Sequence, residues 1–173
     1  MERAVETAEP LAKARGLPVQ VRDGLGETRI GEWTGQALEE LAKTDLWKIV
    51  QHYPSGMTFP GGETIRDMQA RMVAELETVR ALHPGCIVAV VSHADPIKSV
   101  IAHYAGMHLD LFQRLSVSPA SVTAIALGPM GPRLVNLNDT GSLDYLAKSV
   151  HEGEQPAGSD KSEQPAGDGD QKE

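Results

Sequence analysis

The sequence contains a single cysteine, Cys86, among 173 residues. One thiol excludes an intrachain disulfide and any metal site built from several cysteines. This composition is typical of proteins from a reducing compartment, and we expect the protein to be cytoplasmic.

Long apolar runs are also missing. The longest run, Cys86 to Val91, has six residues, whereas a membrane helix needs about 20. The first residues, Met1 to Arg3, lead into a polar stretch and not into the apolar region of a secretory signal. We therefore expect a soluble protein without a membrane partner.

The chain also lacks an excess of basic residues. The chain has 16 Lys and Arg against 24 Asp and Glu, for a net charge of −8. Seven of the acids and two of the bases lie in residues 151–173, which leaves 17 acids and 14 bases, or −3, in residues 1–150. Because attraction to a phosphate backbone depends on clustered Lys and Arg, no nucleic acid is expected as a partner.

The end of the chain differs in composition from the rest. It is rich in Gly, Pro and acidic residues, and the pentapeptide at Glu154–Gly158 recurs at Glu163–Gly167. Such a segment lacks the large apolar side chains that a core requires. We predict one folded domain over residues 1–147 and a disordered acidic tail over residues 148–173.

The spacing of apolar residues predicts both helices and strands within residues 1–147. The predicted helices cover residues 2–15, 36–43, 46–52, 64–82 and 96–105. The predicted strands cover Val19–Val21, Cys86–Val91 and a hairpin of residues 121–127 and 133–137. Because Cys86–Val91 is apolar throughout and partly β-branched, it is typical of a strand buried on both faces of a parallel sheet.

His93 follows that apolar run directly. Asp95 is predicted to cap the next helix, with Pro96 as its first residue. Ligands of α/β proteins bind at the carboxyl ends of strands, where a helix N-terminus also attracts anions. Position alone does not separate a binding histidine from a structural one.

Four separated stretches together resemble the histidine phosphatase superfamily, which includes cofactor-dependent phosphoglycerate mutase and many small phosphomonoesterases. The stretches are Arg3–Ala8 (Arg-Ala-x-x-Thr-Ala), Leu25–Gly35 (Leu-x-Glu, then Gly-x-Trp-x-Gly), Pro60–Thr64 (Pro-Gly-Gly-Glu-Thr) and Val91–Lys98 (Val-Ser-His-x-Asp-Pro-x-Lys). They occur in the family's order. The second half, including Gly106–Arg114 and Asn136–Gly141, looks most like an actinobacterial branch of probable phosphomutases.

The resemblance implies an α/β three-layer sandwich with a mostly parallel sheet. It also implies a reaction in which a histidine of a Leu-x-Arg-His-Gly motif attacks phosphorus and becomes a phosphohistidine. Arg3 would grip the phosphoryl oxygens, His93 would donate to them, and Glu27 would be general acid and base. This scheme needs no metal and no cofactor. Glu63 either belongs to the motif or is an acid favoured at a helix start.

The Arg-His-Gly motif does not occur in the 173 residues. The resemblance therefore implies a domain that lacks the family's first strand-helix unit, and the chain as written is expected to be inactive. Two explanations stand: Met1 is an internal methionine of a longer protein, or the chain is a truncated form that no longer catalyses.

The predicted function is phosphoryl transfer on a small phosphorylated metabolite, with hydrolysis favoured. A phosphoglycerate-mutase-like phosphomutase and a noncatalytic module that binds a phosphate ligand or a protein are the alternatives. The sequence does not decide the substrate or the oligomeric state, and a homo-oligomer stays open.

Overall fold

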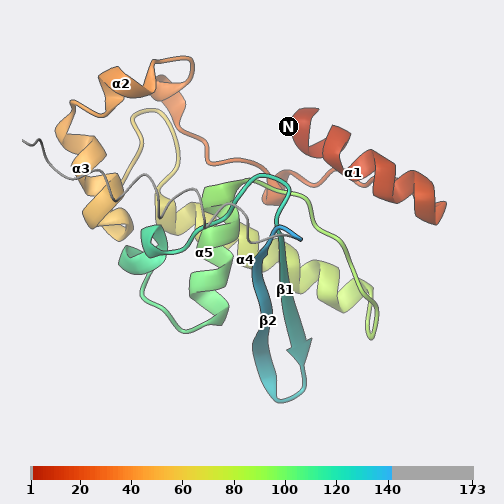
Figure 1. The fold of residues 1–173 in the computed structure, drawn as a ribbon. Helices are drawn as coiled ribbons and strands as arrows, with labels where there is room; N and C mark the ends of the chain where they lie inside the picture. Colours follow the sequence, from red (N-terminus) through yellow and green to blue (C-terminus); the bar gives the residue numbers. More distant parts are fainter. Residues whose placement is uncertain (1, 142–173) are drawn as a thin grey trace, which may run out of the picture. The chain divides into compact units, whose positions relative to one another are not determined.

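A computed structural model describes residues 2–141, of which residues 2–140 belong to one compact unit. The helices are α1 (Glu2–Arg15), α2 (Leu38–Leu41), α3 (Asp45–His52), α4 (Ile65–Leu82) and α5 (Ala94–Tyr104) (Figure 1). Four 3-10 turns are η1 (Asp23–Leu25), η2 (Gly31–Trp33), η3 (Pro54–Gly56) and η4 (Leu109–Arg114). Strands β1 (Val122–Gly128) and β2 (Gly131–Asp139) complete the described part.

Helix α4 confirms the helix predicted over residues 64–82. Thr64 is its N-cap, and the Thr64 hydroxyl accepts a hydrogen bond from the Asp67 backbone N–H at 2.9 Å. This bond satisfies one of the donors that a helix start leaves unpaired. The buried side chains of α4 recur at helical spacing, so one face of the helix lies in the core: Ile65, Met68, Met72 and Val79.

Helix α5 starts two residues earlier than predicted, at Ala94 and not at Pro96. His93, and not Asp95, occupies the N-cap position, in an extended conformation. The Asp95 carboxylate instead lies 3.3 Å from the Lys98 ammonium, one turn later. The predicted end is confirmed, because Gly106 follows the helix with a φ of 66°, a left-handed conformation that glycine adopts without strain.

The core lies where α5 packs against α4 and η4. Fully buried residues come from all three elements, among them Met68, Ile101 and Phe112. The ring of Trp33 completes the core from η2, with its centroid 5.3 Å from that of Phe59 in an edge-to-face arrangement.

The hairpin is confirmed. Strands β1 and β2 pair antiparallel, with Gly128 opposite Gly131 at the turn (Figure 1). Gly131 has a φ of 98°, which suits the short connection between the strands.

The mostly parallel sheet is a wrong prediction for the described residues. The hairpin is the only sheet in residues 2–141, and neither Val19–Val21 nor Cys86–Val91 pairs as a strand. Val21 is 62% exposed and Ile87 is fully exposed. An apolar β-branched run favours an extended conformation. To become part of a sheet, however, it must form backbone hydrogen bonds with a neighbouring strand, and the run's own sequence does not determine whether such a strand is present.

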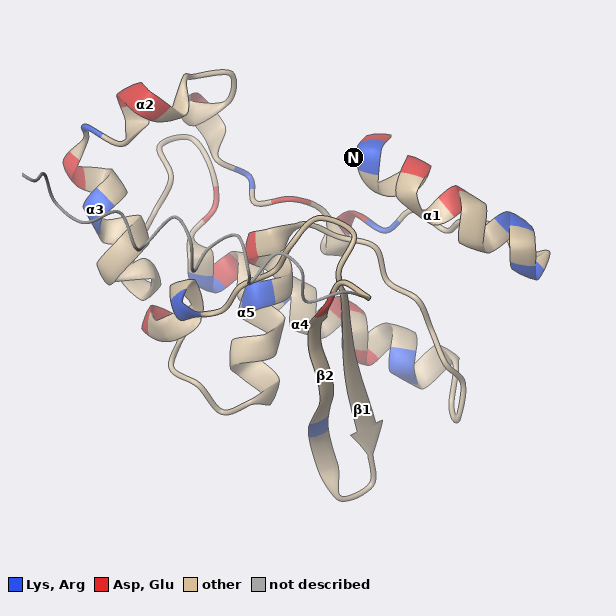
Figure 2. Cartoon of the chain, viewed as in Figure 1, with Lys and Arg blue, Asp and Glu red and all other residues tan. Residues whose placement is uncertain are grey.

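The predicted boundary at residue 147 and the predicted tail over residues 148–173 lie outside the described residues. Within residues 2–141, no helix combines the length and the apolar character that a membrane crossing demands. Helices α1 and α4 each carry both acidic and basic residues (Figure 2).

Candidate active site

Three residues predicted for the site meet in the structure, although they come from distant segments. Arg3 lies in the first turn of α1, Glu27 follows η1, and His93 caps α5. The Arg3 Nη2 atom donates to Glu27 Oε2 at 2.9 Å and lies 3.1 Å from His93 Nδ1. The Arg3 Nε atom also donates to His93 Nδ1, at 3.3 Å. The structure therefore assembles a cluster of one cation, one carboxylate and one imidazole.

The contacts of His93 favour one tautomer. A guanidinium can only donate, so the two contacts from Arg3 favour Nδ1 as an acceptor, with the proton of the neutral ring on Nε2. The Glu27 Oε2 atom lies 3.3 Å from the same Nδ1 atom and acts in the opposite sense. Burial lowers the pKa of His93, the nearby Glu27 carboxylate raises it, and Arg3 lowers it, with a net decrease. The Nε2 atom is buried and has no hydrogen-bond partner among the described residues. His93 therefore presents an unused N–H donor.

Arg3 and Glu27 are more accessible than His93. The exposed fraction of the side chain is 74% for Arg3, 42% for Glu27 and 5% for His93. Glu27 Oε1 accepts from the Thr28 backbone N–H at 3.0 Å, which leaves Oε2 facing Arg3. Solvent and a ligand can thus reach the carboxylate and the guanidinium, while the imidazole is held in the protein.

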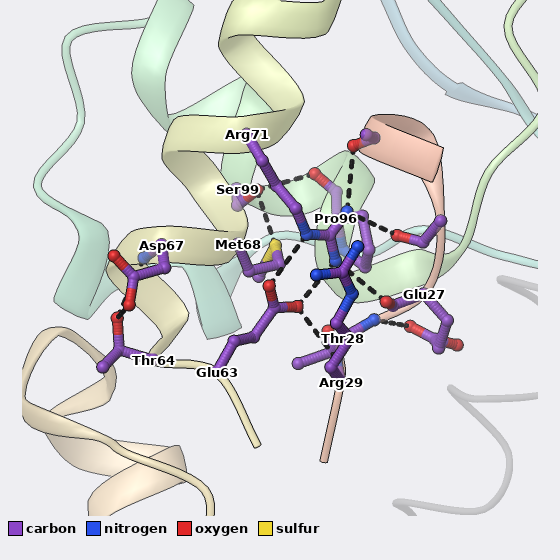
Figure 3. Close-up of polar contacts among 12 residues, drawn as sticks. Glu27, Thr28, Arg29, Glu63, Thr64, Asp67, Met68, Arg71, Pro96 and Ser99 are labelled. Carbon is purple, nitrogen blue, oxygen red and sulfur yellow. Dashed lines mark hydrogen bonds and ion pairs between the residues drawn. The ribbon is translucent and has the colours of Figure 1, made fainter. Parts of the chain in front are cut away.

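A second ion pair supports the segment that carries Glu27, and Figure 3 shows it beside Glu27 and Arg29. Arg71 of α4 donates from Nη2 to Glu63 Oε1 at 2.6 Å and from Nε to Glu63 Oε2 at 2.8 Å. Both side chains are nearly buried, with exposed fractions of 16% for Arg71 and 10% for Glu63. Burial raises the pKa of Glu63, but hydrogen bonds from Arg71 and from the Arg29 backbone outweigh it and hold this pKa below its usual value.

Sequence reasoning missed Arg71 and left Glu63 undecided. One signal was available, because Arg71 lies next to the buried face of α4, between Met68 and Met72. An arginine at such a position needs a partner for its charge. The sequence alone did not identify that partner, which lies before the helix.

Close backbone contact joins the segment after Glu27 to the Pro60–Thr64 motif. A Cβ atom on Gly31 would lie 2.2 Å from the Pro60 carbonyl oxygen, and one on Gly62 would lie 2.2 Å from the Arg29 carbonyl oxygen. Gly31 also has a φ of 54°. Glycine is required at both positions because no side chain fits between the two backbones.

The described residues offer no obvious metal centre. In the range 2–141, no three His, Cys, Asp or Glu side chains are grouped closely enough to hold an ion. The cluster of Arg3, Glu27 and His93 contains one carboxylate, and the cation beside it already balances its charge. This donor set is suited to an anion and not to a metal ion.

Comparison with known proteins identifies relatives over most of the chain. Phosphoserine phosphatase 1 of Hydrogenobacter thermophilus is 29% identical over 154 residues, which cover 87% of this chain and 72% of the relative. The bifunctional protein Rv2228c of Mycobacterium tuberculosis is 32% identical over 146 residues, 83% of this chain. The match spans 40% of that relative's length.

Solved structures and a family model agree with these relatives. Bacillus stearothermophilus YhfR superposes with a TM-score of 0.75 at 25% identity, over 80% of this chain and 70% of that protein. The model of the histidine phosphatase superfamily, branch 1, matches residues 1–140, a range that includes all four motifs and the cluster of Arg3, Glu27 and His93. The chain therefore belongs to branch 1 of the histidine phosphatase superfamily.

Proposed function

We propose that Arg3, Glu27 and His93 form the phosphoryl-binding and proton-transfer part of a phosphatase site for a small phosphomonoester. The observation that carries the proposal is their convergence, with the Nε2 donor of His93 buried and unpartnered among the described residues. Membership of the superfamily and a relative named a phosphoserine phosphatase support the substrate class.

The electrostatics of the cluster favour a phosphoryl group. Arg3 supplies a permanent positive charge and N–H donors in a fork that matches two phosphoryl oxygens. The Nε2–H of His93 adds a neutral donor, whose orientation is fixed by the bonds from Arg3 to Nδ1. Donors held in place before the reaction stabilise the charge that develops on the phosphoryl oxygens.

Glu27 is suited to both proton transfers. When a histidine nucleophile forms its N–P bond and the P–O bond to the leaving group breaks, the protonated carboxyl gives its proton to the leaving oxygen. When water then attacks phosphorus and the N–P bond breaks, the carboxylate takes the proton from that water. The family resemblance assigns the nucleophile to the Arg-His-Gly motif, which is not among these 173 residues.

Hydrolysis of p-nitrophenyl phosphate at mildly acidic pH tests the proposal. We would compare the 173-residue chain with a version extended through the upstream reading frame. Turnover is expected from the extended protein. His93→Ala is expected to reduce kcat about 100-fold, the scale of losing one transition-state donor.

Two outcomes contradict the proposal. Turnover that is unaffected by His93→Ala and by Glu27→Gln would remove both residues from the reaction. Phosphate binding without turnover in either version would instead support the noncatalytic module.

A further inference from the structure

All five N–H groups of Arg71 are occupied. Two of them bind the carboxylate of Glu63, at 2.6 and 2.8 Å. The other three bind backbone carbonyl oxygens: Gly24 at 2.9 Å, Gly26 at 2.9 Å and Glu27 at 2.8 Å. Because a guanidinium has five N–H donors, none remains for a ligand, and any effect of Arg71 on the site must pass through these partners.

The segment from Gly24 to Arg29 begins in η1 and continues without a regular element, and side chains hold its backbone. Four consecutive carbonyl oxygens, those of residues 24 to 27, accept hydrogen bonds from two side chains, since the Ser92 hydroxyl donates to Leu25 at 2.7 Å. On the other side of Glu27, the Arg29 backbone N–H donates to Glu63 Oε1 at 2.9 Å. The backbone of Glu27 is therefore fixed before and after its Cα atom.

Arg71 and Glu63 act together in this arrangement. Glu63 Oε1 accepts from both Arg71 and the Arg29 backbone, so the ion pair bridges the two ends of the segment (Figure 3). Hydrogen bonds of a charged group in a nearly buried place are strong and directional. Lysine at position 71 would keep the charge, but its three donors on one atom cannot reproduce a planar fork.

We propose that Arg71 is a positioning residue for Glu27, which sets the place of the general acid by clamping the carbonyl oxygens of residues 24, 26 and 27. The inference rests on the proposed role of Glu27 in proton transfer. Arg71 does not touch the substrate. Its contribution is to keep the carboxylate within reach of the leaving oxygen, since a displacement of about 1 Å can cost about 100-fold in rate.

A double-mutant cycle on kcat tests this inference. In the version that hydrolyses p-nitrophenyl phosphate, Arg71→Lys is expected to lower kcat about 10-fold or more, with KM changed less than about twofold. Glu27→Gln is expected to lower kcat about 100-fold or more. If Arg71 acts through Glu27, adding Arg71→Lys to Glu27→Gln has no further effect.

Arg66→Lys is the matched control. Arg66 also lies on α4, but it donates to the backbone carbonyl of Ser55 in η3 and not to the segment that carries Glu27. This variant is expected to keep kcat. If Arg71→Lys lowers kcat by the same factor with and without Glu27→Gln, its role is merely structural and the inference is wrong. If Glu27→Gln itself leaves kcat unchanged, the proposed function fails instead.

Hydrogen exchange gives a readout without turnover. In the 173-residue chain, Arg71→Lys is expected to speed exchange of the Thr28 and Arg29 amides at least about 10-fold relative to Arg66→Lys. Equal exchange in the two variants would overturn the clamp. Should Arg71→Lys fail to fold, Glu63→Gln weakens the hold on Arg71 and on the Arg29 amide, and faster exchange at Arg29 than in Arg66→Lys is expected. Unchanged exchange in that variant would overturn the clamp.

Discussion

The two arginine–glutamate pairs of the site differ in burial and in use. Arg71 and Glu63 are 16% and 10% exposed and make five and three hydrogen bonds, all within the protein. Arg3 and Glu27 are 74% and 42% exposed and share a single bond at 2.9 Å. The first pair is built to hold the backbone, while the second leaves charged groups accessible to a ligand. The same residue types are thus buried and fully paired in one place and open to solvent in the other.

We expect the largest effect from a substitution that breaks the Arg71–Glu63 pair. Arg71→Met leaves the Glu63 carboxylate nearly buried without its cation, and we expect a loss of about 3–5 kcal/mol in the free energy of unfolding. Arg3→Met is expected to cost less than about 1 kcal/mol, because the Arg3–Glu27 pair is exposed to solvent. Chemical denaturation of both variants checks the contrast.

The double variant Glu63→Gln with Arg71→Met is the control for this prediction. It removes both charges and should recover part of the stability lost by Arg71→Met alone. Equal losses for Arg71→Met and Arg3→Met would contradict the distinction between the two pairs.

Two glycines allow a crowded backbone position to be compared with an uncrowded one. Gly31→Ala places a Cβ atom 2.2 Å from the Pro60 carbonyl oxygen at a φ of 54°, and we expect a loss of about 3 kcal/mol. Gly35→Ala has a φ of 79° but no atom within 4 Å of its Cβ, so only the backbone strain of about 1 kcal/mol applies. Thermal unfolding of the two variants measures the difference.

The smallest expected effect is a difference in pH dependence. The pKa of His93 is lower in the fold than its ordinary value of 6.5, mainly through burial, so its stability contribution is complete above pH 6.5 and declines below it. The pKa of Glu63 is lowered from 4.5, so its contribution declines only below pH 4.5.

Unfolding free energies measured between pH 4 and pH 8 check these two windows. His93→Gln should remove the decline that begins below about pH 6.5, since its side chain does not titrate. The decline below pH 4.5 should remain in that variant. A wild-type stability that stays constant from pH 7 to pH 5 would argue against a neutral buried His93.

Local patterns predicted some parts of the molecule and not others. The apolar spacing of Ile65, Met68 and Met72 predicted α4, since a helix buries residues at that interval whatever its neighbours are. The prediction of a buried strand over Cys86–Val91 was wrong for the described residues. A strand needs a pairing partner from elsewhere in the sequence, and composition alone does not show whether a run is buried.

The site divides in the same way. Arg3, Glu27 and His93 could be selected from motifs, and the structure brings them together. The contacts of Arg71 could not be predicted, because its three carbonyl acceptors lie 44 to 47 residues away, in and just after η1. Every residue has a backbone carbonyl oxygen, so the sequence does not indicate which carbonyls accept hydrogen bonds from Arg71. These contacts are seen only in the folded structure.

The run Cys86–Val91, which is exposed from Cys86 to Ala89, has a consequence for the behaviour of the chain at high concentration. Ile87 is fully exposed and Val88 is 44% exposed, in six uncharged residues without proline or glycine. Such stretches match the composition of segments that stack between copies as steric zippers. Aggregation of the 173-residue chain is therefore expected to increase with its concentration. The substitution Ile87→Lys should suppress this aggregation.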